Sequence, residues 1–313
     1  MDNDLISEAE SFDNHVQTRV SHGMIPDLRR AQACDWFYNN IWRRPYLLDM
    51  VFGRDFRFAM AHHHGHSLLE VGSGPGHLAL EFARAGLEVT GLELSEKCVE
   101  IARRYANENP YTDGYGSLSY VQGDFLDWEP CRTFDTICFF GTLHHFKKPA
   151  MALEKVDSLL AKNGRLIVIE PARDDLTAKD ALIIALIRQL LALQNGWFEK
   201  LVPPRNANEL ESYITECLRE YKEARDKTEA TQSPRDNSTY SRQIIAALRG
   251  RFNEVALQKG FCFIHRVGAG VRSESEEHTR MISEFLALFD KYAVDHGVLN
   301  PGEFLWAGEK MSL

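Results

Sequence analysis

The stretch LLEVGSGPGH, residues 68–77, decides the fold of this chain. It begins as a buried strand closed by an acid, and three glycines follow at every second position. Glycine permits a sharp turn and puts no Cβ in the way of a ligand. The pattern then predicts a helix over about 76–85, whose first N–H groups point at the same space. A strand, a glycine turn and a helix in this order indicate a site for a nucleoside-bearing cofactor.

Two acids indicate which cofactor the turn would hold. Glu70 closes the first strand, and Glu93 ends the next predicted strand. A dinucleotide site follows the pattern G-x-G-x-x-G and holds a pyrophosphate at the helix N-terminus. Here the third glycine comes one residue early, and His77 holds the place that it should fill. Glu70 would repel a phosphate but suits an ammonium or sulfonium group, and Glu93 can accept both ribose hydroxyls. These details favour S-adenosylmethionine over a dinucleotide.

A third strand leads to residues that suit an adenine ring. Residues 117–121 read as a short strand, and Gly123-Asp124-Phe125 follow it. Asp124 can accept a hydrogen bond from an adenine amino group, and Phe125 can pack on the ring. Gly-Asp is also an ordinary turn sequence, so the pair predicts little by itself.

Two further strands place histidines and an acid together. Residues 134–146 read as a buried strand that opens into a loop carrying His144 and His145. Residues 164–171 read as another buried strand, preceded by an amphipathic helix and ended by Glu170 and a proline. Strands that alternate with helices in this way predict a parallel, doubly wound sheet.

Together these motifs resemble the class I S-adenosylmethionine-dependent methyltransferases. The resemblance covers residues 64–173 closely and 239–313 loosely. It implies an α/β fold with a Rossmann-like, seven-stranded, mostly parallel sheet and helices on both faces. It places the cofactor, S-adenosyl-L-methionine, at the carboxyl ends of strands one to four. By position the implied cofactor residues are Glu70, Gly72, Gly74 and Gly76 at the methionine part, Glu93 and Leu94 at the ribose, Asp124 and Phe125 at the adenine, and Gly141 and His145 beside them.

Methyl transfer requires the enzyme to align donor and acceptor, exclude water and, for a hydroxyl acceptor, remove a proton. Some sugar and natural-product O-methyltransferases that this chain resembles use a histidine on this loop with an acid at the end of strand five. We expect His144 to be the base and Glu170 to orient its ring. Alternatively the histidines only pack against the cofactor or cap the next helix, which is the interpretation we favour for His145. An amine acceptor needs no strong base, so N-methylation is compatible with the same loop.

The predicted organisation has three parts. Residues 1–63 form an N-terminal helical lid, residues 64–173 and 239–313 form the cofactor-binding core, and residues 174–238 form a helical insertion after strand five. The insertion is expected to select the substrate or to contact a second subunit. Within the last part of the core we expect elements in this order: a helix over 241–258, a strand over 261–267, a helix over 275–295 and a strand over 303–308.

The two additions offer further candidates. The aromatic segment 34–46 can close over the methyl donor, or it can form the core that joins the lid to the sheet. Residues 181–198 carry apolar residues at helical spacing. Such a helix packs on the sheet or on a second subunit, so a homodimer is compatible with the sequence.

Charge and composition exclude other classes. The 313 residues carry a formal net charge of -9, whereas nucleic-acid binding usually needs a basic face. The longest apolar segment, 181–193, is shorter than the roughly 18 residues of a membrane span. Six cysteines without a C-x-x-C pair and no secretory leader predict reduced thiols and a cytoplasmic protein. The cluster His62-His63-His64-x-His66 has no acid or Cys at ligand spacing, so we expect a solvated loop and no metal site.

The sequence therefore predicts a cytoplasmic small-molecule methyltransferase that acts on an oxygen, or a nitrogen, of a metabolite or natural product. Two alternatives remain open. One is a protein or RNA methyltransferase, against which the acidic balance and the lack of an Asn/Asp-Pro-Pro-Tyr motif count. The other is a cofactor-binding module without catalysis that serves as a partner protein.

Overall fold

Seven strands form one sheet in the order β3-β2-β1-β4-β5-β7-β6. This is seen in a computed structural model that describes residues 3–30, 41–222, 233–236 and 239–311. The neighbouring pairs among the first five strands are parallel, and β7 runs antiparallel to both β5 and β6. The strands are β1 (Ser67–Val71), β2 (Glu88–Glu93), β3 (Ser117–Gln122), β4 (Phe134–Phe140), β5 (Leu160–Pro171), β6 (Phe252–Lys259) and β7 (Glu303–Lys310). The predicted Rossmann-like sheet is confirmed.

Helices cover both faces of the sheet because the central strands are apolar on both sides, as buried parallel strands usually are. One face packs against α3 (Arg54–His62), α4 (His77–Arg84) and α5 (Glu96–Asn107), through side chains such as Phe58, Phe82 and Val99. The other face packs against α6 (Pro149–Leu159) and α9 (Ser241–Arg249), through Leu153 and Ile244 among others. Among the described helices, none combines the length and apolar character that a membrane span requires.

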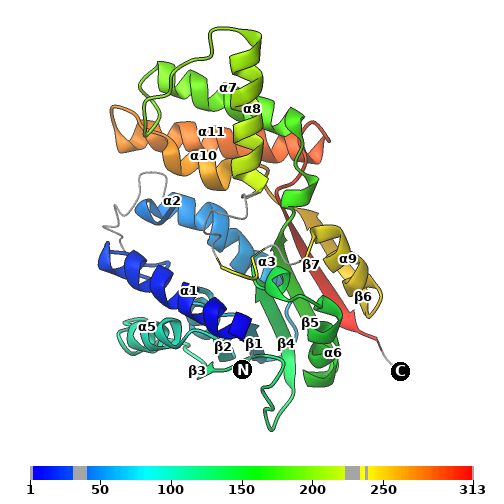
Figure 1. Cartoon of the computed structure of the whole chain (residues 1–313). Helices are drawn as coiled ribbons and strands as arrows, with labels where there is room; N and C mark the ends of the chain where they lie inside the picture. Colours follow the sequence, from blue (N-terminus) through cyan, green and yellow to red (C-terminus); the bar gives the residue numbers. More distant parts are fainter. Residues whose placement is uncertain (1–2, 31–40, 223–232, 237–238, 312–313) are drawn as a thin grey trace.

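The N-terminal segment is helical where it is described. It comprises α1 (Asn3–Ser21), η1 (Ile41–Arg43), α2 (Pro45–Leu48) and η2 (Asp49–Gly53), which runs on into α3. In Figure 1, α1 lies beside α5, across the end of the sheet where the parallel strands finish. Asp13 on α1 fixes this position, because its carboxylate accepts hydrogen bonds from the Ser95 hydroxyl and from the Lys97 N–H at the start of α5. Of the aromatic segment 34–46, residues 34–40 lie outside the described part of the chain.

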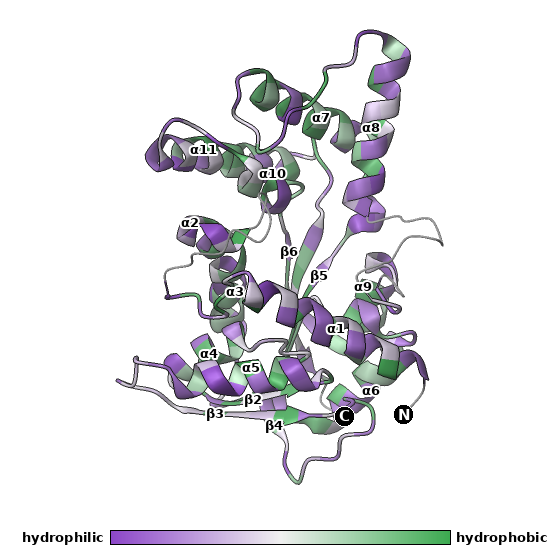
Figure 2. Cartoon of the chain, turned by 60° about the vertical axis from the view of Figure 1, so that its left-hand side comes forward, coloured by the Kyte–Doolittle hydropathy of each residue, from purple (hydrophilic) through white to green (hydrophobic). Residues whose placement is uncertain are grey.

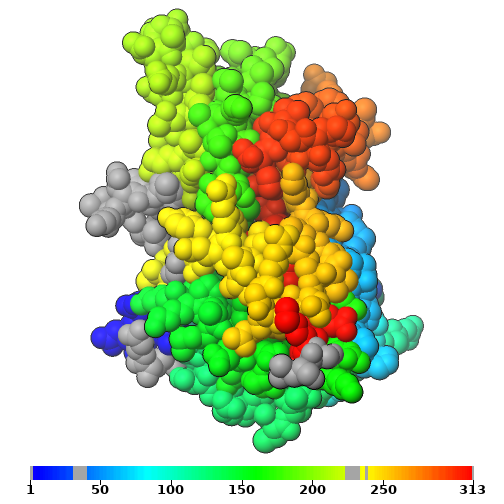
Figure 3. Space-filling model, turned by 90° about the vertical axis from the view of Figure 1, so that its right-hand side faces the viewer, coloured from blue at the N-terminus to red at the C-terminus, as the bar shows by residue number. Residues whose placement is uncertain are grey.

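A second layer of helices stands beyond the carboxyl ends of the strands (Figures 1 and 3). It contains α7 (Ala178–Leu193) and α8 (Ala207–Lys222) from the chain after β5, and α10 (Ile264–Gly270) and α11 (Glu276–Asp295) from the chain between β6 and β7. Ile184, Tyr221, Val267 and Leu286 belong to one buried cluster that joins these helices. The layer is therefore built from two separate insertions.

The helix α7 presents an apolar stripe to solvent. Figure 2 shows that α7 is more hydrophobic than α8. The stripe consists of four leucines that are each about half exposed: Leu182 (46 %), Leu186 (53 %), Leu190 (55 %) and Leu193 (58 %). The opposite side of the helix packs against α8 and the rest of the upper layer. The exposed stripe is compatible with contact to a second subunit, and the homodimer stays a prediction.

The prediction for residues 241–267 was correct for the helix over Ser241–Arg249, which is α9, and wrong for the residues that follow it. The helix expected over 241–258 ends at Arg249, and Phe252–Lys259 forms the edge strand β6. Its residues include several good helix formers, but pairing with β7 overrides that local preference. The apolar run expected to form a strand over 261–267 instead contains the beginning of α10. The buried Asp290 carboxylate accepts the backbone N–H groups of Cys262, Phe263 and Ile264, each at 2.8 Å. A residue that is distant in the sequence therefore caps the beginning of α10.

Replacement of Gly76 tests how tightly the glycine turn packs. Gly76 has a φ of +84°, and a Cβ there would lie 2.3 Å from the Tyr120 hydroxyl oxygen. We expect Gly76→Ala to lower the free energy of unfolding by roughly 2–4 kcal/mol through strain and collision. Gly114→Ala is the control, because Gly114 has a φ of +69° but open space around the Cβ position. Equal losses in urea unfolding would contradict the packing argument.

Candidate functional site

A cavity of about 1020 Å³ opens at the carboxyl ends of the strands. Its walls come from the loops after β1 to β5, from α1, and from α10 and the beginning of β7. Ligand sites commonly lie at this edge of an open α/β sheet, where the strand order reverses. The volume reaches the upper end of the range for sites of drug-sized ligands, which is about 300–1,000 Å³. The cavity therefore has room for a cofactor and an acceptor together.

The glycine turn after β1 forms one wall, and its three glycines have different tasks. Gly74 has a φ of +53° and no atom within 4 Å of its Cβ position, so it faces open space where a ligand can approach. A Cβ on Gly72 would lie 2.3 Å from the Thr142 side chain. Gly76 does not line the cavity, and its carbonyl accepts a hydrogen bond from the Tyr120 hydroxyl at 3.0 Å. Gly76 therefore serves close packing between the turn and β3.

Two buried carboxyl groups face the cavity beside this turn. Glu70 is 2 % exposed, and its Oε2 has no hydrogen-bond partner among the described residues. Glu93 is 7 % exposed and accepts the N–H groups of Gly74 and Ser95, each at 2.8 Å. Burial raises the pKa of both groups, and Glu93 adds to the rise at Glu70. A cationic ligand with hydroxyl groups relieves both the missing hydrogen bonds and the cost of burial.

The other predicted cofactor residues lie on the same wall. Leu94, Asp124, Phe125 and Gly141 all line the cavity. Asp124 also accepts the Leu126 N–H at 3.0 Å, and Phe125 is 3 % exposed and shared with the hydrophobic core. Gly141 has a φ of +62° and open space at its Cβ position. The structure therefore brings together every predicted cofactor residue except Gly76.

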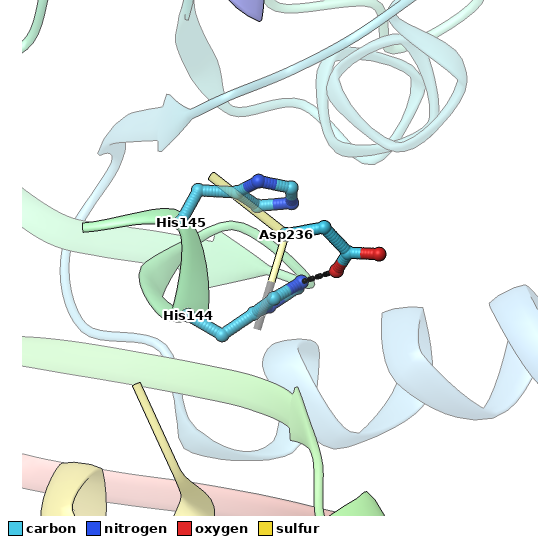
Figure 4. Close-up of side chains that lie close together, drawn as sticks. All are labelled: His144, His145 and Asp236. Carbon is cyan, nitrogen blue, oxygen red and sulfur yellow. Dashed lines mark ion pairs between the residues drawn. The ribbon is translucent and has the colours of Figure 1, made fainter. Parts of the chain in front are cut away.

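His144 is held between two carboxylates. It lies in η3 (Leu143–His145), and its Nδ1 is 2.6 Å from Glu170 Oε2, while its Nε2 is 3.3 Å from Asp236 Oδ1. Burial lowers the pKa of His144, but Glu170 and Asp236 outweigh this effect and raise the pKa to about 9. At neutral pH the ring is therefore a positioned imidazolium. Figure 4 shows the Asp236 carboxylate directed at the His144 ring.

Glu170 itself is anchored by the loop that it orients. Its carboxylate accepts the backbone N–H groups of Thr142 at 2.8 Å and Leu143 at 2.6 Å. Burial would raise the pKa of Glu170, but the charged His144 and these N–H groups hold it below its usual value. A carboxylate that is ionised and fixed in this way sets the orientation of the histidine ring, as the acid does in a catalytic triad.

His145 has a different environment. Its ring lies against His144, with 4.2 Å between ring centroids, and its Nδ1 is 2.8 Å from Glu8 Oε1 on α1. The Glu8 carboxylate also accepts hydrogen bonds from the Ser233 hydroxyl at 2.8 Å and from the Arg235 N–H at 2.9 Å. His145 lines the cavity, yet its partners show that it also ties α1 and residues 233–236 to the loop.

The donor set can be weighed for a metal ion. The ligand atoms of His144, His145 and Asp236 lie within 4.8 Å of one another. However, the Arg173 guanidinium is 3.3 Å from the same Asp236 oxygen that faces His144, which disfavours a further cation there. We interpret the three side chains as a proton-holding network. His62, His63, His64 and His66 belong to no such grouping within the described part of the chain.

Several residues of the cavity were missed by sequence reasoning. His77 lies between the rings of Trp42 and Phe52, at 5.3 and 4.5 Å between centroids, and burial lowers its pKa to about 4. Asp236 lies in an irregular segment of the insertion, where no local pattern marks it. Glu303 stands at the beginning of β7, and an acid at a strand end is the signal that could have found it.

Comparisons with known proteins agree with this architecture. Residues 49–218, more than half of the chain, match the family model described as "Methyltransferase domain". The mitochondrial ubiquinone biosynthesis O-methyltransferase of Schizosaccharomyces pombe is 27% identical over 153 residues, which cover 49% of this chain and 54% of that protein. The uncharacterized methyltransferase YcgJ of Bacillus subtilis is 30% identical over 107 residues, which cover 34% and 40%. The chain thus spans about half the length of the curated relatives that it matches.

The crystal structure of the [4+2]-cyclase SpnF superposes with a TM-score of 0.52 at 15% identity, over 97% of this chain and 94% of that one. At this identity the likeness shows the fold alone. The family match, the strand order and the acid-lined glycine turn agree, and the chain belongs to the class I S-adenosylmethionine-dependent methyltransferases.

Proposed function

We propose that this protein transfers a methyl group from S-adenosylmethionine to an oxygen of a small metabolite or natural product. The observation that carries the proposal is the His144–Glu170 pair, which faces the cavity at the end of β4 beside the acid-lined turn. A fixed base at this position has a use for a hydroxyl acceptor, whereas an amine acceptor needs none. The curated relatives that are named O-methyltransferases support the same choice.

The chain's residues fit the cofactor that this family uses. Glu93 can accept the ribose hydroxyls, the open backbone at Gly74 and Gly141 allows close approach, and the unsatisfied Glu70 carboxyl suits the positively charged methionine part. When bound, S-adenosylmethionine supplies an electrophilic methyl group on a sulfonium leaving group. The protein's contribution is to align the acceptor with that methyl group and to exclude water from the cavity.

When the His144 ring is neutral, the proton of the acceptor hydroxyl would pass to its Nε2, so at pH 7 the imidazolium must first release a proton to solvent. Its Nδ1 faces Glu170 at 2.6 Å, so Nε2 is the atom left to face the acceptor. In the described conformation Asp236 Oδ1 is 3.3 Å from that same atom. The acceptor hydroxyl must therefore displace Asp236 before His144 can take its proton. Residues 233–236 then act as a cover that gives way to the acceptor.

Two further observations concern the non-catalytic alternative and the location of the protein. A cofactor-binding partner protein would have no use for an oriented histidine, so the His144–Glu170 pair disfavours that role. The described cysteines, Cys98, Cys131, Cys138, Cys217 and Cys262, form no disulfide, which supports a cytoplasmic location.

The direct test is transfer of a labelled methyl group. The purified protein is incubated with methyl-labelled S-adenosylmethionine and separate pools of phenols, polyols, amines, peptides and RNA. We expect label on the hydroxyl-bearing small molecules. Cofactor binding without transfer to any pool would instead support the non-catalytic role, and label on peptides or RNA would overturn the substrate class.

Replacement of Glu93 tests the ribose assignment. We expect Glu93→Ala to weaken binding of S-adenosylmethionine by roughly 10- to 100-fold in calorimetry, because hydrogen bonds to a charged acceptor contribute about 1.5–3 kcal/mol. Glu88→Ala, at the exposed beginning of the same strand, is the control and should leave the affinity unchanged. An unaltered dissociation constant for Glu93→Ala would contradict the assignment of Glu93 to the ribose.

Replacement of His144 tests the base. We expect His144→Ala to lower kcat by roughly 10²- to 10⁴-fold, the usual contribution of general base catalysis, while cofactor affinity stays nearly constant. His278→Ala, on the exposed first turn of α11, should have no effect. Equal losses of turnover and cofactor binding would point to a packing role for His144.

The pH dependence of kcat/KM tests whether Asp236 raises the pKa of His144. A base acts when deprotonated, so kcat/KM should rise with pH to an inflection near pH 9, the pKa of His144 in the free enzyme. Asp236→Asn removes one of the two carboxylates and should move the inflection to lower pH. Asp175→Asn is the control, since Asp175 pairs with Arg242 instead. An inflection that does not move would show that Asp236 leaves the pKa of His144 unaffected.

A further inference from the structure

The cavity also reaches a second group of lining residues away from the glycine turn, and we call this part of the cavity the distal chamber. Its polar lining consists of Asp55 on α3, Glu220 at the end of α8, His265 and Arg266 on α10, and Glu303 at the beginning of β7. Leu176 and Tyr221 supply apolar wall. None of these residues belongs to the glycine turn or to the His144–Glu170 pair. The distal chamber is formed where the upper helical layer meets the sheet.

Two polar groups of the distal chamber lack hydrogen-bond partners among the described residues. His265 Nδ1 is buried without a partner. Asp55 uses Oδ1 for both of its hydrogen bonds, which come from Arg54, and Oδ2 makes none. A buried polar atom left unpaired costs on the order of 1–3 kcal/mol, so a ligand group gains by binding at His265 Nδ1. Asp55 Oδ2 is available as a further acceptor for the same ligand.

The carboxylates of the distal chamber are already paired with arginines, and the Arg266 guanidinium donates to the Glu220 carbonyl at 3.0 Å. Arg54 lies between Asp55 and Glu303, and the remaining lining carboxylate, Glu220, also has an arginine partner. The nitrogen–oxygen distances are 2.6 Å for Arg54–Asp55, 2.9 Å for Arg54–Glu303 and 2.7 Å for Arg188–Glu220. Burial lowers the pKa of His265 to about 4, against the effect of Glu303, so this ring is neutral at pH 7. The chamber therefore suits a neutral polar group better than an ion.

The distal chamber lies next to the site of chemistry. In the β5–β7 ladder Glu303 pairs with Pro171, the residue that follows Glu170. One residue along a strand corresponds to about 3.4 Å. Glu170 and Glu303 therefore lie at the same end of neighbouring strands, and His144, His265 and Asp55 line one cavity.

We propose that the distal chamber is an acceptor-binding subsite for neutral polyhydroxylated molecules, in which His265 and Asp55 bind a second hydroxyl group while the first is methylated. A hydroxyl both donates and accepts, so it can donate to Asp55 Oδ2 and exchange a hydrogen bond with the His265 ring. The inference rests on the proposed O-methyl transfer and adds the class of acceptor. His265 acts here as a specificity-determining residue.

Four matched phenols test the proposal: para-ethylphenol and its hydroxyethyl, aminoethyl and carboxymethyl analogues. Their binding to the protein loaded with S-adenosylhomocysteine is measured by calorimetry, and their KM and kcat are measured with labelled S-adenosylmethionine. We expect the hydroxyethyl analogue to bind roughly 3- to 10-fold more tightly than the other three, the gain from one neutral hydrogen bond. His265→Ala should remove this preference and leave binding of S-adenosylhomocysteine unchanged. His265→Asn, which can still donate and accept, should restore part of it.

The outcomes separate the two proposals. Equal affinity for all four phenols, preference for a charged analogue, or no binding by any of them would overturn the subsite. A hydroxyethyl preference that His265→Ala does not change would overturn the role of His265. If the preference and its loss in His265→Ala are seen but no label reaches any phenol, the subsite stands and the proposed O-methyl transfer fails. His278→Ala serves as the matched surface control and should behave as the unaltered protein does.

Discussion

The site depends on one buried carboxylate, Glu170. It is 1 % exposed and accepts three backbone N–H groups of the loop after β4, as well as facing the His144 ring. A buried carboxylate is costly unless it is paired and hydrogen-bonded, so this loop can adopt few other conformations around it. The same contacts join the carboxyl ends of β4 and β5. The floor of the cavity and the orientation of His144 are therefore set by a single interaction.

Much of the fold could be predicted because its signals are local. The glycine turn, the acids at strand ends and the alternation of buried strands with amphipathic helices all lie within short stretches of the chain. The edge strand β6 and the helix α10 could not be predicted in the same way. β6 depends on pairing with β7, and α10 begins where the carboxylate of Asp290, more than twenty residues along the chain, accepts its first N–H groups.

The residues of the site likewise fall into those that local sequence patterns predict and those that depend on long-range contacts. His144 and Glu170 could be placed together because parallel strands four and five are neighbours, and the structure finds them 2.6 Å apart. The approach of Asp236 to His144 depends on the short turn at residues 233–236, which is distant from His144 in the sequence. The distal chamber likewise requires two insertions to meet, which no single stretch of sequence reveals. Local patterns thus indicate the predicted cofactor region, and tertiary contacts determine the region that we propose for the acceptor.

The Glu8 carboxylate connects three segments of the chain beside the cavity. It is the shared partner of three segments, since α1 carries it and both the His145 ring and residues 233–236 bind to it. Loss of the Glu8 carboxylate would remove one tie between α1, the loop that carries His145 and residues 233–236, while Asp13 would still hold α1 to α5. The positions of α1 and of residues 233–236 are therefore coupled through one carboxylate that lines the cavity, and a change of residue 8 alone would alter both.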